Sequence, residues 1–169
     1  MKILMRLLSL IILLSLIWLA AGCTFQIIQP AAPESITLIS VHERYVTALG
    51  EQGRWAVSQE QTLSPCTRFE MAHLANGKVT LRTCQGKYVA APRNGAESSD
   101  WMLQQAASPG DCGQFDLYEL GEHRVAFKTC AGRFWTAGNG DWESSLAWSV
   151  IAETEKLSSW EIFLMTPAP

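Results

Sequence analysis

Three stretches of the chain carry the same alternation of hydrophobic and polar residues. The letters ITLISVHERYVTA, VTLRTCQGKYVAA and VAFKTCAGRFWTA begin at residues 36, 79 and 125 and align without a gap. A hydrophobic period of two predicts a β-strand with one buried face, and the small or polar residues that follow predict a turn. After the turn each copy has an aromatic residue, at Tyr45, Tyr88 and Phe134. Each repeat is therefore expected to begin with two strands joined by a turn.

The second halves of the three units also align. We place Trp55, Trp101 and Leu146 at one repeat position, fourteen residues before Phe69, Phe115 and Trp160. An acidic residue follows each aromatic residue, which aligns Glu70, Asp116 and Glu161. The segments between the halves vary in length and are rich in Gly, Asn and Ser, which predicts hairpin turns. Each unit is expected to form four strands around one variable hairpin.

Three four-stranded units of this length predict an all-β fold, the β-trefoil, in which six strands form a barrel and three hairpins cap it. We expect repeats at about 36–74, 79–120 and 125–165, within a domain of residues 36–166. A propeller blade has a similar length, but at least four blades are usual. Three units that close on themselves leave no open sheet edge.

The turn phrase carries a family resemblance. Gly86–Ala91 and Gly132–Ala137 resemble the Gly-Lys-Tyr phrase of the fascin-like (actin-crosslinking) trefoil family, and His42–Ala48 is a weaker copy with Glu43 where glycine is expected. The resemblance covers about residues 36–165 and implies the trefoil fold. Ricin-type lectins, the other large trefoil family, carry Gln-x-Trp in each repeat, and only Gln114–Asp116 comes near that motif.

The first 22 residues predict a secretory signal. Lys2 and Arg6 precede the apolar run Leu7–Ala21, and small residues stand before Cys23. Residues 20–23, Ala-Ala-Gly-Cys, resemble the bacterial lipobox, which implies that Cys23 is diacylated and becomes the new N-terminus. The alternative is an uncleaved membrane anchor, although about 16 apolar residues are short for a span of ~20. Residues 23–35, with two prolines, are then a linker from the membrane to the domain.

Location and charge follow from this segment. We expect an exported, membrane-anchored lipoprotein of the cell envelope. Thr24 rather than Asp follows the cysteine, and resemblance to Gram-negative lipoprotein sorting signals then implies the outer membrane or cell surface. Actin binding is not carried over from the resemblance, since an exported bacterial domain would not meet actin. The net charge is −3, and without residues 1–22 it becomes −5, with 11 basic against 16 acidic residues. An acidic domain is a poor nucleic-acid binder, so we expect no nucleic-acid partner.

The cysteine count agrees with export. Five cysteines are present, and if Cys23 is lipidated an even set of four remains: Cys66, Cys84, Cys112 and Cys130. Cys84 and Cys130 share a repeat position that Val41 fills in repeat one. Cys66 and Cys112 share another, three residues before the aromatic residue, and our alignment puts Leu157 there in repeat three.

Four cysteines permit three pairings. Only Cys66–Cys84 with Cys112–Cys130 uses the same contact between consecutive repeats twice and leaves an apolar pair at the third. A tight hairpin at Asn76-Gly77 would set Phe69 opposite Cys84, so this pairing requires the chain to bend at Ser64-Pro65. The alternative is four unbridged buried thiols.

No catalytic signature is present. The sequence lacks Gly-x-Ser-x-Gly, a phosphate loop and Cys-x-x-Cys, and the three histidines (His42, His73 and His123) fall at unrelated repeat positions. We interpret the histidines as surface residues, and the aligned acidic residues as strand residues with structural or surface roles. We therefore expect no enzyme, no metal and no cofactor.

A trefoil usually acts through its hairpins. The richest variable segment contains Trp142, an aromatic residue outside the aligned positions, with Asn139 and Asp141 beside it. An indole ring can stack on a sugar face and the two polar side chains can bind hydroxyls. Arg93 and Asn94 form a weaker second patch. The alternative is that Trp142 folds onto the barrel cap. The other tryptophans of the repeats are expected in the core or cap and are not site candidates: Trp55, Trp101, Trp148 and Trp160.

These observations predict a non-catalytic, monomeric, lipid-anchored trefoil that binds glycan or envelope polysaccharide. Two alternatives remain open. One is a protein-interaction or scaffold module of the envelope, and the other is a purely structural lipoprotein without a small ligand.

Overall fold

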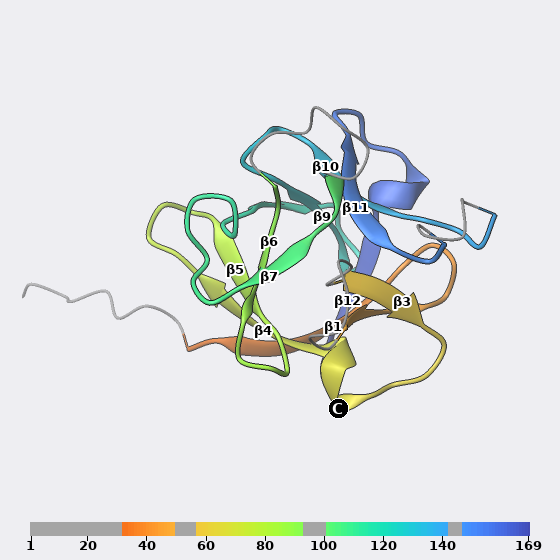
Figure 1. Cartoon of the computed structure of the whole chain (residues 1–169), viewed down its shortest axis with the longest axis horizontal. Helices are drawn as coiled ribbons and strands as arrows, with labels where there is room; N and C mark the ends of the chain where they lie inside the picture. The colour runs from red at the N-terminus through yellow and green to blue at the C-terminus, as the bar shows by residue number, and fades with distance from the viewer. Residues whose placement is uncertain (1–31, 50–56, 93–100, 142–146) are drawn as a thin grey trace, which may run out of the picture.

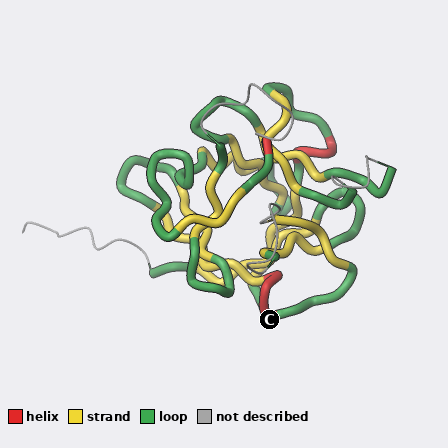
Figure 2. Tube along the Cα trace, viewed as in Figure 1, coloured by secondary structure: helices red, strands yellow, loops and turns green. Residues whose placement is uncertain are grey.

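A computed structural model describes residues 32–49, 57–92, 101–141 and 147–169. Strands and loops make up nearly all of these residues, with short 3-10 segments between them (Figure 2). The strands in chain order are β1 (Glu34–Ile39), β2 (Tyr45–Ala48), β3 (Val57–Glu60), β4 (Arg68–His73), β5 (Val79–Arg82), β6 (Tyr88–Ala90), β7 (Gln104–Ala106), β8 (Asp116–Glu119), β9 (Arg124–Lys128), β10 (Phe134–Ala137), β11 (Val150–Thr154) and β12 (Phe163–Pro167). The 3-10 helices are η1 (Pro65–Thr67) and η3 (Ser159–Glu161).

Six strands close into a barrel, and the other six form three hairpins (Figure 1). The barrel order is β1, β4, β5, β8, β9, β12 and back to β1. Val79 and Phe115 join β5 to the start of β8 through two backbone hydrogen bonds of 2.9 Å. The hairpins are β2–β3, β6–β7 and β10–β11. This is the architecture of a β-trefoil, and the predicted fold class is confirmed.

The first halves of the repeats match the sequence alignment. The aromatic residue after each turn pairs with the end of the preceding strand, as Ile39↔Tyr45, Arg82↔Tyr88 and Lys128↔Phe134. Equivalent hydrogen bonds close the three turns, with the amide of residue 40, 83 or 129 donating to the carbonyl of residue 44, 87 or 133. The turn needs a left-handed residue, supplied by Gly86 (φ 74°), Gly132 (φ 78°) and, against its preference, Glu43 (φ 57°).

The core is built from equivalent residues of the three repeats. Three fully buried layers are Leu38, Leu81 and Phe127, then Phe69, Phe115 and Phe163, then Val46, Val89 and Trp135. The third repeat contributes the largest side chains. The ring of Trp135 lies 5.0 Å from that of Phe115 and 4.8 Å from that of Phe127, measured between centroids.

The predicted alignment of the third repeat is wrong in its second half. Strand pairing gives Ile36↔Phe69, Val79↔Phe115 and Val125↔Phe163, so Phe163 rather than Trp160 follows the symmetry. The cause is a longer hairpin between β10 and β11 than in the other two repeats. An alignment by fixed spacing does not anticipate this extra length. Trp160 instead lies in η3, at the position of Cys66 in η1.

Two further assignments change with this correction. Pairing of β6 with β7 and of β10 with β11 places Trp148, not Leu146, at the position of Trp101. Glu161 is not a strand residue equivalent to Glu70, because it ends η3 and is buried. The strand residue at the position of Glu70 is Leu164.

Both expected disulfides are present, Cys66–Cys84 and Cys112–Cys130, with Cα atoms 4.9 and 5.0 Å apart. The chain does bend at Ser64-Pro65, where Ser64 caps η1 by accepting from the amide of Cys66 at 3.3 Å. Two disulfides are consistent with an extracellular protein.

The hairpin between β4 and β5 differs from the expectation by one residue. Gly77 takes φ 80° and its amide donates to the carbonyl of Leu74 at 3.0 Å, which makes a three-residue loop. Glu70 therefore pairs with Arg82, and Phe69 lies opposite Thr83 rather than Cys84.

Candidate functional site

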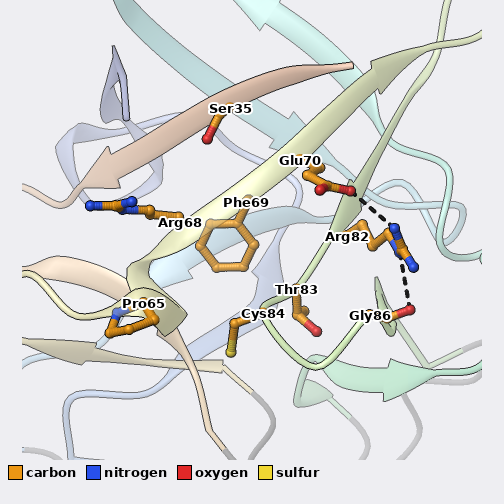
Figure 3. A pocket seen from close by; sticks show the side chains of 9 residues that line it. All are labelled: Ser35, Pro65, Arg68, Phe69, Glu70, Arg82, Thr83, Cys84 and Gly86. Carbon is orange, nitrogen blue, oxygen red and sulfur yellow. Dashed lines mark hydrogen bonds and ion pairs between the residues drawn. The ribbon is translucent and has the colours of Figure 1, made fainter. Parts of the chain in front are cut away.

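The hollow in Figure 3 lies where repeat one ends and repeat two begins, and has a volume of about 350 Å³. Phe69 forms its buried floor. Glu70 and Arg82 line one side and bind each other at 3.2 Å, and the Arg82 Nε donates to the carbonyl of Gly86 at 3.2 Å. The carboxylate and guanidinium therefore satisfy much of each other's charge. The exposed Arg68 adds a further charge to the described lining of this hollow (Figure 3).

A larger groove of about 490 Å³ lies in repeat three, between the β10–β11 hairpin and η3. Its lining is dominated by hydroxyl groups and one indole ring. The lining residues are Thr136, Glu153, Thr154, Lys156, Ser158, Ser159, Trp160 and Glu161. A volume of this size lies within the range of small-ligand sites.

The shape of the groove depends on η3. Ser158 precedes this helix, and both its amide and its hydroxyl donate to the Glu161 Oε2, at 2.8 and 2.6 Å. Glu161 is only 2% exposed. Its carboxylate therefore holds the start of η3 in place, and a buried carboxylate with two donors is stable there. This arrangement fixes Ser159 and Trp160 at the groove wall.

Thr136 lines the groove and carries a buried hydroxyl without a hydrogen-bond partner among the described residues. The residue lies on β10 and is 3% exposed, and its Oγ1 has no hydrogen-bond partner in the described part of the chain. An unpaired buried hydroxyl costs about 1–3 kcal/mol. The oxygen is almost wholly covered in this structure, so a ligand group would recover that energy only after a small shift of the groove wall exposes it. Thr47, the equivalent residue of repeat one, also has an unpartnered Oγ1 among the described residues but does not line this groove.

Trp160 is half-buried and contacts repeat one through His42. The two rings meet edge to face, with centroids 5.4 Å apart and planes at 77°. His42 also meets Trp148 in the same way at 5.8 Å, and its Nε2 lies 3.1 Å from the carbonyl oxygen of Ala137, which requires that this nitrogen carry the proton. The expectation that His42 is a plain surface residue is wrong, because it joins two tryptophans.

The residues expected to bind ligand are placed differently. Asn139 and Asp141 bind each other, with the Asn139 Nδ2 donating to the Asp141 Oδ2 at 3.3 Å and the Asp141 amide donating to the Asn139 Oδ1 at 3.2 Å. Neither is among the lining residues of the groove. Trp142, Arg93, Asn94 and the lipidation candidate Cys23 lie outside the described residues.

Sequence reasoning missed Thr136, Ser158, Ser159 and Trp160. The signal for Trp160 was a tryptophan at the repeat position where Cys66 and Cys112 stand. The misplaced alignment of repeat three hid this signal, because it put Leu157 there. The hydroxyl residues gave no signal, since serine and threonine are common in turns of any function.

The described residues show neither a metal-binding group nor a membrane-spanning helix. Over residues 32–49, 57–92, 101–141 and 147–169, no group of three or more His, Cys, Asp or Glu side chains is arranged to hold a metal ion. Within the same ranges, no helix has the length and apolar character needed to cross a membrane.

No family model and no curated protein matches the chain. Among solved structures the chain is similar to a designed three-fold symmetric protein, ThreeFoil, with a TM-score of 0.62 and 17% sequence identity. The match covers 79% of this chain and 99% of the designed one. At this identity the likeness shows the fold alone, and the fascin-like resemblance stays a prediction.

Proposed function

We propose that this protein is a non-catalytic, exported binding module for glycan, and that the groove beside Trp160 is its binding site. The observation that carries the proposal is the unpartnered hydroxyl of Thr136, which is buried in the wall of a groove rich in other hydroxyl groups. A sugar offers hydroxyls that both donate and accept, so it matches this wall better than an apolar ligand does.

The second feature that supports a sugar is the indole of Trp160. An aromatic ring offers a flat apolar surface with a polar edge, which suits a pyranose with its C–H face and ring of hydroxyls. The lining also holds one cation, Lys156, and two carboxylates, those of Glu153 and Glu161. The balance of charge favours a neutral glycan over an acidic one.

Glycan-array binding of Thr136→Val tests the proposal. Valine keeps the shape of threonine and removes only the hydroxyl. We therefore expect the affinity for glycan to fall about tenfold, which corresponds to the loss of roughly one hydrogen bond between uncharged groups. The matched control is Thr47→Val, which removes an equally buried hydroxyl at the same position of repeat one. Equal losses in both variants would show that the groove is not the site.

Two further variants separate the groove from the hairpin. Trp160→Ala removes the ring that lines the groove, and Trp142→Ala removes the ring of the hairpin segment that the sequence favours for binding. Loss in the second alone would move the site to the hairpin. If the wild-type protein binds no glycan and a pull-down from envelope extracts returns a stoichiometric protein, the scaffold alternative replaces the present proposal.

Lipid anchoring at Cys23 is part of the proposal. The lipobox resemblance and the two disulfides support an exported, tethered domain. We expect the wild-type chain to incorporate radiolabelled palmitate and the Cys23→Ala variant to incorporate none. Label retained in that variant would contradict lipidation at this residue.

A further inference from the structure

The barrel has three equivalent contacts between the end of one repeat and the start of the next, and one of them differs in kind. The outward pair of residues across this contact is Glu70↔Arg82 at the first and Asp116↔Lys128 at the second. At the third, the 3–1 junction, the pair is Leu164↔Ile39. The fold therefore accepts charged residues at these two outward positions, and the apolar pair is specific to the 3–1 junction.

The disulfide position shows the same change. The first two junctions carry Cys66–Cys84 and Cys112–Cys130. At the 3–1 junction Val41 takes the place of Cys84 and Cys130, and it is 45% exposed. Leu164 is 40% exposed.

These apolar residues form one shallow groove. Ile39, Val41, Ile162 and Leu164 line a hollow of about 330 Å³ together with Ser40, Ser159 and Arg124. We name this group the junction patch. Among the described residues that line it, only Arg124 is charged, and its side chain is about half exposed and lies 3.5 Å from the Glu122 carboxylate.

We infer that the junction patch rests on the surface of an anionic phospholipid bilayer. This inference rests on the anchoring at Cys23 proposed above. Exposed aliphatic side chains beside a single arginine suit the boundary between headgroups and acyl chains, where the aliphatic groups leave water and the guanidinium meets phosphate.

The size of the patch supports this occupant over a second copy of the chain. A stable protein interface uses about 20–30 residues on each side. The junction patch has four apolar residues. So small a surface binds usefully only when its target is already held close, and a lipid on the same chain provides that proximity.

The length of the N-terminal segment allows the required orientation. Ten residues lie between Cys23 and Glu34, where β1 begins, and the eleven Cα–Cα steps can span up to about 36 Å. The patch lies at the other end of β1, a strand of six residues and roughly 20 Å. A tether at one end of β1 therefore reaches far enough for the patch at the other end to touch the membrane.

The test uses residues 23–169 with both disulfides formed, so that Cys23 is the one free thiol. This thiol is coupled to a maleimide lipid in vesicles of phosphatidylcholine and phosphatidylglycerol, which replaces natural lipidation. Hydrogen exchange of peptides that cover residues 39–43 and 159–165 is compared with and without the vesicles. We expect vesicles to slow exchange in these peptides several-fold and to leave β6–β7 unchanged.

Variants make the result specific. Val41→Ser combined with Leu164→Ser is expected to abolish the protection, while Leu63→Ser, at an equally exposed apolar residue outside the patch, is expected to retain it. Arg124→Gln, or vesicles of phosphatidylcholine alone, is expected to reduce it. Should the double serine variant fail to fold, these last two measurements still decide.

Three outcomes would overturn the inference. They are equal exchange with and without vesicles, protection unaffected by the double serine substitution, and protection that grows with protein concentration in the absence of vesicles. The last would assign the patch to a second copy. Because the maleimide lipid supplies the tether, a failure of natural lipidation in the palmitate experiment would be seen separately.

Discussion

The guanidinium carbon of Arg44 lies 3.6 Å from the centroid of the Trp148 ring and links the first repeat to the third. The same relationship recurs elsewhere, because Arg133 at the equivalent position lies 5.4 Å from the ring of Trp101. Each cation comes directly before the aromatic residue of the turn, and each tryptophan lies two or three residues before the second strand of the hairpin in a neighbouring repeat. Cation–aromatic contacts therefore join adjacent caps of the barrel.

Replacement of Arg44 by alanine tests the energy of this contact. Cation–π pairs contribute about 0.5–1 kcal/mol when exposed and about 2 kcal/mol when desolvated, and both partners here are half-buried. We expect Arg44→Ala to lower the free energy of unfolding by about 1 kcal/mol, measured by urea denaturation.

Arg68→Ala is the matched control for this substitution. Arg68 is exposed, and its loss should change stability by no more than about 0.5 kcal/mol. Equal effects of the two alanine substitutions would mean that the stacking on Trp148 contributes nothing measurable.

Glu43→Gly is expected to stabilise the protein. Glu43 holds φ 57° where the other repeats have glycine, and left-handed backbone costs a non-glycine residue about 1–2 kcal/mol. Glycine loses more backbone entropy on folding, which offsets about 0.5–1 kcal/mol of that gain. A rise in unfolding free energy of about 0.5–1 kcal/mol should follow in thermal or urea melts.

The reverse change at the same repeat position is the control. Gly86→Ala places a side chain on a residue with φ 74°, so it should destabilise by about 1 kcal/mol or more. If both substitutions moved stability in the same direction, the argument from backbone conformation would be wrong.

The disulfide Cys66–Cys84 closes a loop with a sequence separation of 18. On the chain-entropy account its removal costs about 3 kcal/mol. We expect Cys66→Ser combined with Cys84→Ser to lose about this amount in denaturant melts. Removal of Cys112–Cys130, which has the same sequence separation of 18, should cost a similar amount. A loss below about 1 kcal/mol in both pairs would mean that the junctions are held mainly by packing.

The sequence predicts the fold well because the buried residues recur at equivalent positions in the three repeats. Alternation of period two and the Gly-Lys-Tyr turn set the first two strands of each unit, and these pair as expected at Tyr45, Tyr88 and Phe134. The disulfide pairing follows from the same symmetry. Both features depend on positions close together in the chain, where alignment without gaps is secure.

The candidate site was not predictable in the same way. It arises where the third repeat departs from the other two, with Trp160 at a cysteine position. The junction patch arises from a second departure, with Leu164 at an acidic position. Recognising a departure requires the correct register, and the longer connection before β11 shifts that register by two or three residues. The burial of Thr136 beneath η3 is a tertiary property with no local pattern.

An engineered third disulfide tests the corrected register directly. Trp160 stands at the position of Cys66, and Val41 at that of Cys84, so Val41→Cys combined with Trp160→Cys should place two thiols as the native cysteines are placed, with Cα atoms about 5 Å apart. Such a bridge would close a loop longer than 100 residues, for which the entropic stabilisation is about 4.7 kcal/mol. Loss of the Trp160 packing against His42 offsets part of this gain, by less than the roughly 3–5 kcal/mol expected for a fully buried aromatic side chain, because Trp160 is half-buried.

Peptide mapping under non-reducing conditions should therefore find the two introduced thiols joined to each other beside the two native bridges, with a net gain in stability smaller than about 4.7 kcal/mol. The control pair is Val41→Cys with Leu157→Cys, which the uncorrected alignment favours. That pair should remain reduced, because Leu157 lies before the Ser158 cap and outside η3. If the Leu157 pair closed and the Trp160 pair did not, the register of the third repeat given by β12 would be wrong. The assignment of the groove wall around Trp160 would fail with it.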